Sequence, residues 1–189
     1  LTTENILGTE KQASVSYKGI VEDVNIGDLL FIDDGKIRLS VSKKTKTSLI
    51  CDILRGGIVS NHKGINIPHS DIKLAAITKK DKIDAKLAIE NDLEYVALSF
   101  VGKADDLKML RDHLDKLGGS KIKIIAKIER PRAVDNLEEI VKLSDILMVA
   151  RGDLGVEIGV ENVPRIQRLI IQEAKKHIKP VIVATQMLE

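Results

Sequence analysis

The feature that most constrains the fold is a change of pattern near residue 70. After this point, amphipathic helical stretches alternate with short, nearly continuous apolar runs of the kind found in buried parallel strands. This alternation predicts a parallel sheet with helices outside it, because parallel strands need a crossover connection, usually a helix. Before residue 70 the apolar runs are short, and Gly and Asp turns separate them, which predicts a small all-β domain, either a barrel or a sandwich. We therefore expect two domains, residues 1–69 and 70–189.

The first domain should contain short strands joined by tight turns. Asp34-Gly35 lies between two β-branched or alternating runs and is a strong hairpin signal. The runs that we expect to form strands are 15–17, 29–32, 37–41 and 49–54.

The second domain carries helix start and stop signals at its apolar stretches. Thr78 suits a helix N-cap, Gly118-Gly119 suits a helix end, and Pro131 suits the first turn of a helix. Four strands and four helices in about 120 residues amount to half of a (β/α)₈ barrel, or to a small open α/β sheet. We expect helices over 79–91, 104–117, 131–143 and 163–177, and strands over 95–100, 122–128, 145–150 and 181–184.

Composition argues against several classes of function. The chain has 30 Lys and Arg against 28 Asp and Glu, and only four aromatic residues, which does not favour nucleic-acid binding. No apolar run approaches the roughly 20 residues of a membrane helix, so we expect no membrane partner. The single cysteine, Cys51, allows neither an internal disulfide nor a cysteine metal cluster, so we expect a reducing compartment, the cytoplasm.

Candidate functional residues lie where the predicted parallel strands end, because sites in such folds gather at the carboxyl ends of strands. In the run 122–129, a period of two puts Lys127 and Glu129 on the face opposite Ile124, Ala126 and Ile128. A cation and a carboxylate there suit phosphate binding and metal ligation, and an internal Lys–Glu pair explains them equally well.

The other strand ends add weaker signals. Asp153 offers an oxygen ligand for Mg²⁺ in a segment whose glycines let backbone N–H groups approach an anion, although a simple Gly/Asp turn is the more common explanation for this segment taken alone. Thr185 and Ser99 end two further strands and carry hydroxyls. Lys63, in the first domain, could reach a nucleotide phosphate, but from sequence alone a solvated surface lysine is the more common explanation for such a residue. Five polar residues are predicted at one edge of the sheet: Ser99, Lys127, Glu129, Asp153 and Thr185. Together they indicate a functional site more specifically than any one of them does.

At these motifs the sequence resembles the pyruvate kinase family. The matching stretches occur in the family's order across nearly the whole chain. They are Ile32-Asp33-Asp34-Gly35, Lys63-Gly64-Ile65-Asn66-Ile67-Pro68, Thr78-Lys79-Lys80-Asp81, Val96-Ala97-Leu98-Ser99-Phe100-Val101, Lys123-Ile124-Ile125-Ala126-Lys127-Ile128-Glu129, the run from Met148 to Glu157, and the run from Ala184 to Glu189. Among the departures, Arg130-Pro131-Arg132-Ala133 stands where the family frequently has Asn-x-x-Gly.

The resemblance implies a fold and a reaction. Residues 1–69 would be the β-rich lid, and residues 70–189 would run from the third helix to the seventh strand of a (β/α)₈ TIM barrel. The implied reaction moves the phosphoryl group of phosphoenolpyruvate to ADP and gives pyruvate and ATP, the last step of glycolysis. The lid would close over the substrates and exclude water, which competes for the phosphoryl group.

The resemblance also implies roles for individual residues. Lys127 matches the lysine that stabilises the transferring phosphoryl group, and Glu129 and Asp153 match the ligands of the essential Mg²⁺ or Mn²⁺. Thr185 matches a substrate-contacting threonine near the carbon that gains a proton, and Lys63 matches a lid lysine that contacts the nucleotide. Further substrate-binding positions are expected at Ser99, Ala150, Arg151 and Gly152.

Other family features would lie outside this chain. The resemblance places the K⁺ ligands before Leu1, and it implies a homotetramer for the full-length protein. We expect the 189-residue chain to be an excerpt that is inactive and marginally stable alone.

Two alternatives from other classes remain. One is a metal-dependent barrel lyase of the aldolase type that acts on pyruvate or phosphoenolpyruvate; it needs no nucleotide lid, so residues 1–69 argue against it. The other is a non-catalytic binding module with the same fold, and the intact set of charged strand-end residues argues against that.

Overall fold

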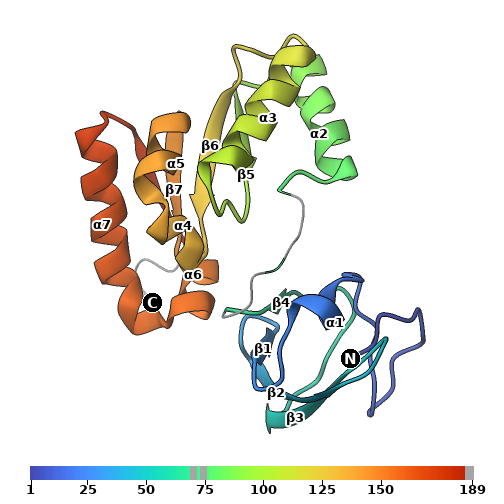
Figure 1. Ribbon diagram of the computed structural model, residues 1–189. Coiled ribbons are helices and arrows are strands. Elements are labelled where there is room, and N and C mark those ends of the chain that lie inside the picture. Colours follow the sequence, from blue (N-terminus) through green and yellow to red (C-terminus); the bar gives the residue numbers. More distant parts are fainter. Residues whose placement is uncertain (69–71, 73–75, 186–189) are drawn as a thin grey trace. The chain divides into compact units, whose positions relative to one another are not determined.

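The computed structural model describes residues 1–68, 72 and 76–185, and the chain divides into two compact units, Leu1–Leu74 and Ala75–Glu189. The first unit is mainly β and the second alternates helices with strands (Figure 1). In chain order the elements of the first unit are α1 (Ile20–Asp23), β1 (Leu29–Ile32), β2 (Ile37–Lys44), β3 (Leu49–Arg55) and β4 (Ile65–Asn66). Those of the second unit are α2 (Lys79–Glu90), β5 (Tyr95–Leu98), α3 (Ala104–Lys116), β6 (Lys123–Ile128), α4 (Pro131–Asp135), α5 (Leu137–Leu143), β7 (Ile146–Ala150), α6 (Arg151–Ile158), the 3₁₀ helix η1 (Val160–Asn162), α7 (Val163–Lys176) and β8 (Val181–Ala184).

The first unit is built on an antiparallel sheet with strand order β3-β2-β1-β4. The predicted hairpin is confirmed: Ile32 pairs with Ile37, and the connecting turn has φ values of +53°, +56° and +80° at Asp33, Asp34 and Gly35. Asp and Gly are among the residues that tolerate this left-handed conformation best, so the turn chemistry sets the register of β1 against β2.

The strand expected over 15–17 is wrong. Ser14 forms only an isolated bridge with Thr2, and the chain then enters the short helix α1. The Tyr17 hydroxyl donates a hydrogen bond to the carboxylate of Asp23 at the end of α1, so this side chain supports the helix instead of alternating across a sheet.

The second unit is a parallel sheet in which strand order follows chain order, β5-β6-β7-β8. Right-handed crossovers that always advance in one direction place their helices on the same face of a sheet. The burial of the β6 side chains agrees with this one-sided arrangement of the helices. Ile124, Ala126 and Ile128 are within the core shared with the helices, whereas Lys127 faces the other side of the sheet. The predicted two-residue period of this strand is therefore confirmed.

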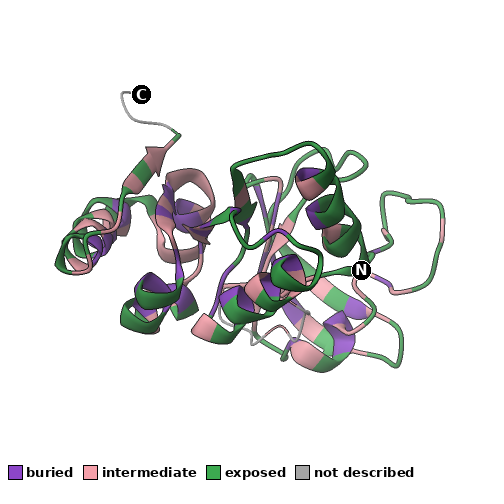
Figure 2. Ribbon diagram, turned by 90° about the horizontal axis from the view of Figure 1, so that it is seen from above, coloured by how far each residue is buried: buried purple, intermediate pink, exposed green. Residues whose placement is uncertain are grey.

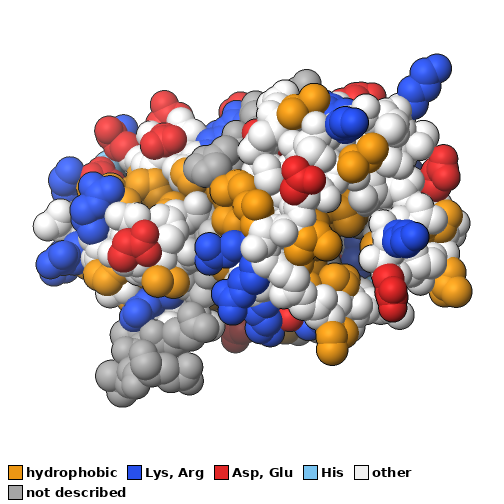
Figure 3. All heavy atoms as spheres, turned by 90° about the horizontal axis from the view of Figure 1, so that it is seen from below, with side chains coloured by type: hydrophobic (Ala, Val, Ile, Leu, Met, Phe, Trp, Pro, Cys, Tyr) orange, Lys and Arg blue, Asp and Glu red, His pale blue; other side chains and the backbone are white. Residues whose placement is uncertain are grey.

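Burial in the second unit follows the apolar stripes of the helices. Figure 2 shows helices with a buried stripe and an exposed face, and α7 illustrates it with Ile166, Ile170 and Ala174 buried. Apolar side chains also reach the surface, as the orange patches of Figure 3 show. Ile83 and Leu87 of α2 are among the exposed apolar residues. In the described parts of the chain no helix combines the length and apolarity needed to cross a bilayer.

Most helix boundaries follow the signals in the sequence. Thr78 caps α2 through a reciprocal pair of hydrogen bonds with Asp81, and Gly118, at φ +87°, ends the turn that follows α3. Pro131 begins α4 as expected, but the predicted single helix 131–143 is divided at Asn136. The Asn136 side-chain amide donates to Arg132 O at 2.9 Å and to Gly102 O at 3.0 Å.

Helix α6 was not predicted, because Gly152 and Gly155 lower the helix propensity of the run 151–158. Packing explains it instead. Leu154 is fully buried, and a Cβ on Gly155 would lie 3.2 Å from a methyl group of Val160. The glycine therefore allows α6 to approach η1 closely.

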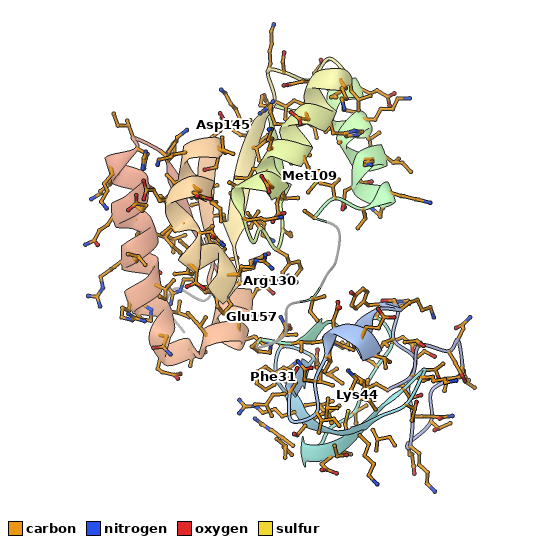
Figure 4. All side chains as sticks on the ribbon, in the orientation of Figure 1. Phe31, Lys44, Met109, Arg130, Asp145 and Glu157 are labelled. Atoms are coloured by element: carbon orange, nitrogen blue, oxygen red, sulfur yellow. The ribbon has the colours of Figure 1, made fainter. Side chains whose placement is uncertain are left out.

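One charged cluster fixes the amino-terminal end of the sheet. The Asp145 carboxylate accepts the Ile124 N–H at 2.9 Å and lies 3.4 Å from Arg111 Nη2 and 3.3 Å from Lys123 Nζ. Arg111 in turn donates to Ile122 O at 2.6 Å. The cluster therefore ties α3 to the start of β6 and β7, at the end of the sheet opposite Arg130 (Figure 4).

Asp145→Ala should lower the free energy of unfolding by about 1–3 kcal/mol, because the buried Ile124 N–H loses its acceptor. Asp115→Ala is the matched control, since this carboxylate also lies beside Arg111 but is 47% exposed, and it should cost less than about 0.5 kcal/mol. Urea denaturation of both variants measures the difference. Equal effects would contradict the role given to Asp145.

Candidate active site

Lys127 and Glu129 occupy the carboxyl end of β6. Lys127 is on the face that is not covered by the described helices, with 22% of its side chain exposed. Glu129 follows the strand and is only 1% exposed. Because a buried carboxylate needs partners to offset its lost hydration, the surroundings of Glu129 decide what this end of the sheet can do.

Lys127 joins two neighbouring strand ends. Its Nζ lies 2.7 Å from Glu129 Oε1 and donates to Ser99 Oγ at 3.0 Å. Ser99 follows β5, which pairs with β6 through Leu98 and Ala126, so the parallel register brings the hydroxyl to the lysine. The structure thus places three of the sequence-predicted residues together.

The second oxygen of Glu129 is held by the backbone. The N–H of Phe100 donates to Glu129 Oε2 at 2.5 Å. Burial raises the pKa of Glu129, whereas the hydrogen bonds from Lys127 and from the Phe100 N–H lower it, and the charge of Asp153 raises it further. The net direction is upward, which shows that burial outweighs these two stabilising contacts.

Asp153 comes from α6, which begins directly after β7. It lies in the first turn of the helix, is half-buried, and acts electrostatically on Glu129. A negative side chain in the first turn is favourable to the helix dipole. Two carboxylates from adjacent strand-to-helix connections therefore act on the same end of the sheet.

The start of α6 is tied to the end of β8. The Gly152 N–H donates to Thr185 Oγ1 at 3.2 Å, and the Thr185 hydroxyl donates to Ala184 O at 2.8 Å. Ala150 and Ala184 are partners in the β7–β8 register, and Arg151 is the first residue of α6. Of the sequence-predicted residues, Ala150, Arg151, Gly152 and Thr185 thus meet at one place.

Lys63 belongs to the other unit. Its Nζ lies 2.7 Å from Asp33 Oδ1 in the β1–β2 turn, and Asp33 Oδ2 lies 2.9 Å from Lys36 Nζ. The hydrogen bond from Lys63, followed by that from Lys36, lowers the pKa of Asp33. The cation expected to meet a phosphate is thus next to a carboxylate, a contact that the sequence analysis did not anticipate.

Phe100 and Arg130 were also missed as site residues. Phe100 contributes a backbone N–H, a group that every residue except proline carries, so its residue type gave no signal. Arg130 places its guanidinium 4.7 Å from the centre of the Phe100 ring. Its position directly after Glu129 was the one hint in the sequence.

The donor set suits a hard divalent cation. Mg²⁺ is usually bound by one or two carboxylates together with waters and substrate phosphates, and Glu129 with Asp153 meets that requirement. Within residues 1–68, 72 and 76–185, no group of three or more His, Cys, Asp and Glu side chains is arranged to hold a metal.

Fold and site together define an α/β protein with a charged strand-end site of the kind that binds small anionic molecules. A family model described as "Pyruvate kinase, barrel domain" matches residues 2–189, and the chain belongs to this family. Curated relatives named pyruvate kinase include those of Clostridium perfringens, 45% identical over 98% of this chain and 39% of the relative, and Thermotoga maritima, 44% identical over 100% and 40%. The relative from Mycobacterium intracellulare is 43% identical over 100% of this chain and 40% of its own length. The chain therefore spans about two fifths of the proteins that it matches.

Asp33→Asn should remove part of the acid sensitivity of the first unit. The pKa of Asp33 is below its ordinary value of 3.8 in the folded chain, so its ionised form stabilises the fold above that value. This stability is lost as the pH falls through the lowered pKa. The variant should therefore be less stable than the parent at neutral pH, and the difference should disappear at acid pH.

Asp34→Asn is the matched control, because Asp34 has nearly the same left-handed φ and is exposed. Asn tolerates that conformation, so both variants keep the turn. Urea denaturation at a series of pH values measures the effect. Parallel pH profiles for the parent chain and Asp33→Asn would refute the role of the Lys63–Asp33 pair.

Proposed function

We propose that this chain is part of a pyruvate kinase that transfers the phosphoryl group of phosphoenolpyruvate to ADP. The observation that carries the proposal is the buried Glu129 carboxylate, paired with Lys127 at the strand ends of a chain that belongs to the pyruvate kinase family. The pair offers a cation for a phosphate and a carboxylate for a metal within one hydrogen-bonded group. Phosphoenolpyruvate, ADP and a divalent cation are the molecules that this chemistry requires.

The finer architecture belongs to the same proposal. The second unit corresponds to an arc of a (β/α)₈ barrel, from the third helix to the seventh strand, with β5 to β8 as strands four to seven. Its sequential parallel order and its one-sided helical cover support this assignment. Residues 1–69 would form the lid that closes over the substrates, and the antiparallel sheet of the first unit is consistent with a separate β domain.

The residues would divide the reaction between them. In the transfer, the bond between phosphorus and the enol oxygen breaks, a bond to a terminal oxygen of ADP forms, and the enolate then takes a proton at carbon to give pyruvate. Lys127 would stabilise negative charge on the transferring group, and Glu129 and Asp153 would ligate Mg²⁺ or Mn²⁺. A bound divalent cation supplies neutralisation of the phosphoryl and enolate oxygens.

The remaining residues would position the substrates. Ala150, Arg151 and Gly152 would meet the substrate carboxylate at the start of α6, where backbone N–H groups favour anions. Thr185 would lie near the carbon that is protonated, and Ser99 would hold Lys127 in place. Lys63 would give up its ion pair with Asp33 and bind a nucleotide phosphate instead.

The wider setting follows from the same family membership. We propose a requirement for K⁺, with ligands outside this chain, a homotetramer for the full-length protein and a cytoplasmic location. Each of these depends on the family and none on the geometry of the described residues.

The direct test is pyruvate formation from phosphoenolpyruvate and ADP with Mg²⁺ and K⁺. The 189-residue chain and the complete product of its gene are assayed side by side. Turnover by the complete product supports the proposal. If the complete product folds and binds Mn²⁺ but forms no pyruvate, the lyase and the non-catalytic module become the better explanations.

Lys127→Met in the complete product should lower kcat about 100-fold or more, because the transferring group loses its charged partner. Lys123→Met is the matched control, since Lys123 is four residues earlier on the same face of β6 and contacts Asp145 at the other end of the sheet. It should leave kcat close to that of the parent protein. Steady-state kinetics measures both, and similar losses in the two variants would count against the role of Lys127.

A further inference from the structure

Phe100 has a backbone conformation that a bulky residue rarely adopts. Its φ is +54°, in the left-handed region, where an L-residue with a large side chain is strained. This conformation accompanies the hydrogen bond from the Phe100 N–H to Glu129 Oε2 at 2.5 Å. Something must therefore hold the residue in this conformation if the contact is to persist.

Arg130 contacts the Phe100 ring. Its guanidinium carbon lies 4.7 Å from the centre of the Phe100 ring, within the range of a cation–π interaction. Proline at position 131 restricts the preceding residue to extended conformations, and Arg130 has φ −131° and ψ +152°. The backbone direction of Arg130 is thus fixed by Pro131, immediately after the carboxylate that Phe100 binds.

The segment after Phe100 is anchored to two helices. Gly102 N and Lys103 N donate to Asp106 Oδ2 of α3 at 2.8 and 3.1 Å, and the Asn136 amide donates to Gly102 O at 3.0 Å. Val101 is 1% exposed. Phe100 itself is 44% exposed, and Arg130 contacts its ring.

We propose that Arg130 and Phe100 are positioning residues for the metal ligand Glu129. Arg130 holds the Phe100 ring, the ring keeps the backbone N–H directed at Oε2, and Lys127 holds Oε1. With both oxygens held, the plane of the carboxylate is fixed, and Glu129 would offer its remaining lone pairs to a divalent cation in one orientation. The inference rests on the proposed function only in taking Glu129 as a metal ligand.

The direction in which Mn²⁺ affinity changes when Arg130 is removed distinguishes a positioning role from a purely electrostatic one. Arg130 is a cation beside the site, so electrostatic repulsion alone predicts that its removal tightens the binding of another cation. Positioning predicts the opposite, because groups that orient a metal ligand typically raise metal affinity.

The test measures Mn²⁺ affinity in the complete gene product without substrates, from the electron paramagnetic resonance signal of free Mn²⁺. Arg130→Ala and Phe100→Leu should each weaken Mn²⁺ binding about two- to tenfold. Arg130→Lys keeps a cation and should retain most of the affinity, and the double variant should be no weaker than either single variant. Arg168→Ala, which removes an exposed arginine of α7, is the control and should change nothing.

A second readout follows the backbone directly. Hydrogen exchange at the Phe100 amide should become faster in Arg130→Ala by a similar factor, while exchange at buried Ile124 stays unchanged. A merely structural role for Arg130 would change thermal stability without this selective loss. Phe100→Leu, whose cation is intact, provides the same test if Arg130→Ala does not fold.

The outcomes keep the two proposals apart. Unchanged or tighter Mn²⁺ binding in both Arg130→Ala and Phe100→Leu overturns the positioning role, whatever the enzyme assay shows. Weaker binding in both, in a protein that forms no pyruvate, supports the positioning role and counts against the kinase. If Glu129→Gln binds Mn²⁺ as well as the parent protein, Glu129 is not the ligand and the positioning role fails with it.

Discussion

The burial of the Glu129 carboxylate is the constraint on which the rest of the site depends. At 1% exposure the ionised group loses its hydration, and Lys127 and the Phe100 N–H are the partners that replace it. Burial raises the pKa of Glu129 above its ordinary value, and the hydrogen bonds from Lys127 and from the Phe100 N–H oppose that shift. A buried carboxyl whose pKa is shifted by burial and by named partners is typical of a functional site.

Stability and chemistry are separated along the sheet. At the amino-terminal end, Asp145 accepts a backbone N–H and contacts Arg111 and Lys123. The role of this cluster is structural, because its contacts hold secondary-structure elements together. At the carboxyl end, polar groups from three strand ends and from α6 meet, among them the Lys127–Glu129 pair and the Gly152–Thr185 hydrogen bond. Lys123 and Lys127, four residues apart on one strand, show the contrast: one belongs to a surface cluster and the other to a half-buried pair.

The sequence predicted those parts of the site that depend on side-chain type and strand period. Alternation along β6 placed Lys127 opposite Ile124 and Ile128, and the structure agrees because the helices cover only the apolar face. Helix α6 was beyond prediction, since its glycines argue locally against a helix and only packing on η1 explains it. The Lys63–Asp33 pair and the Phe100 N–H were missed for a similar reason, because each contact depends on which groups the fold brings together. In addition, nearly every residue has a backbone N–H, so the residue type at position 100 does not reveal this donor.

The two strands at the edges of the parallel sheet, β5 and β8, end in the same unusual way. Phe100 and Thr185 have φ values of +54° and +62°, although aromatic and β-branched residues disfavour this region. In both cases a hydrogen bond accompanies the strained residue: the Phe100 N–H binds Glu129, and Thr185 Oγ1 accepts the N–H of Gly152. Such strain persists only where the surroundings fix it, and it gathers at functional sites. A strained residue at both edges thus reaches the two segments, β6 with Glu129 and α6 with Asp153, that carry the proposed metal ligands.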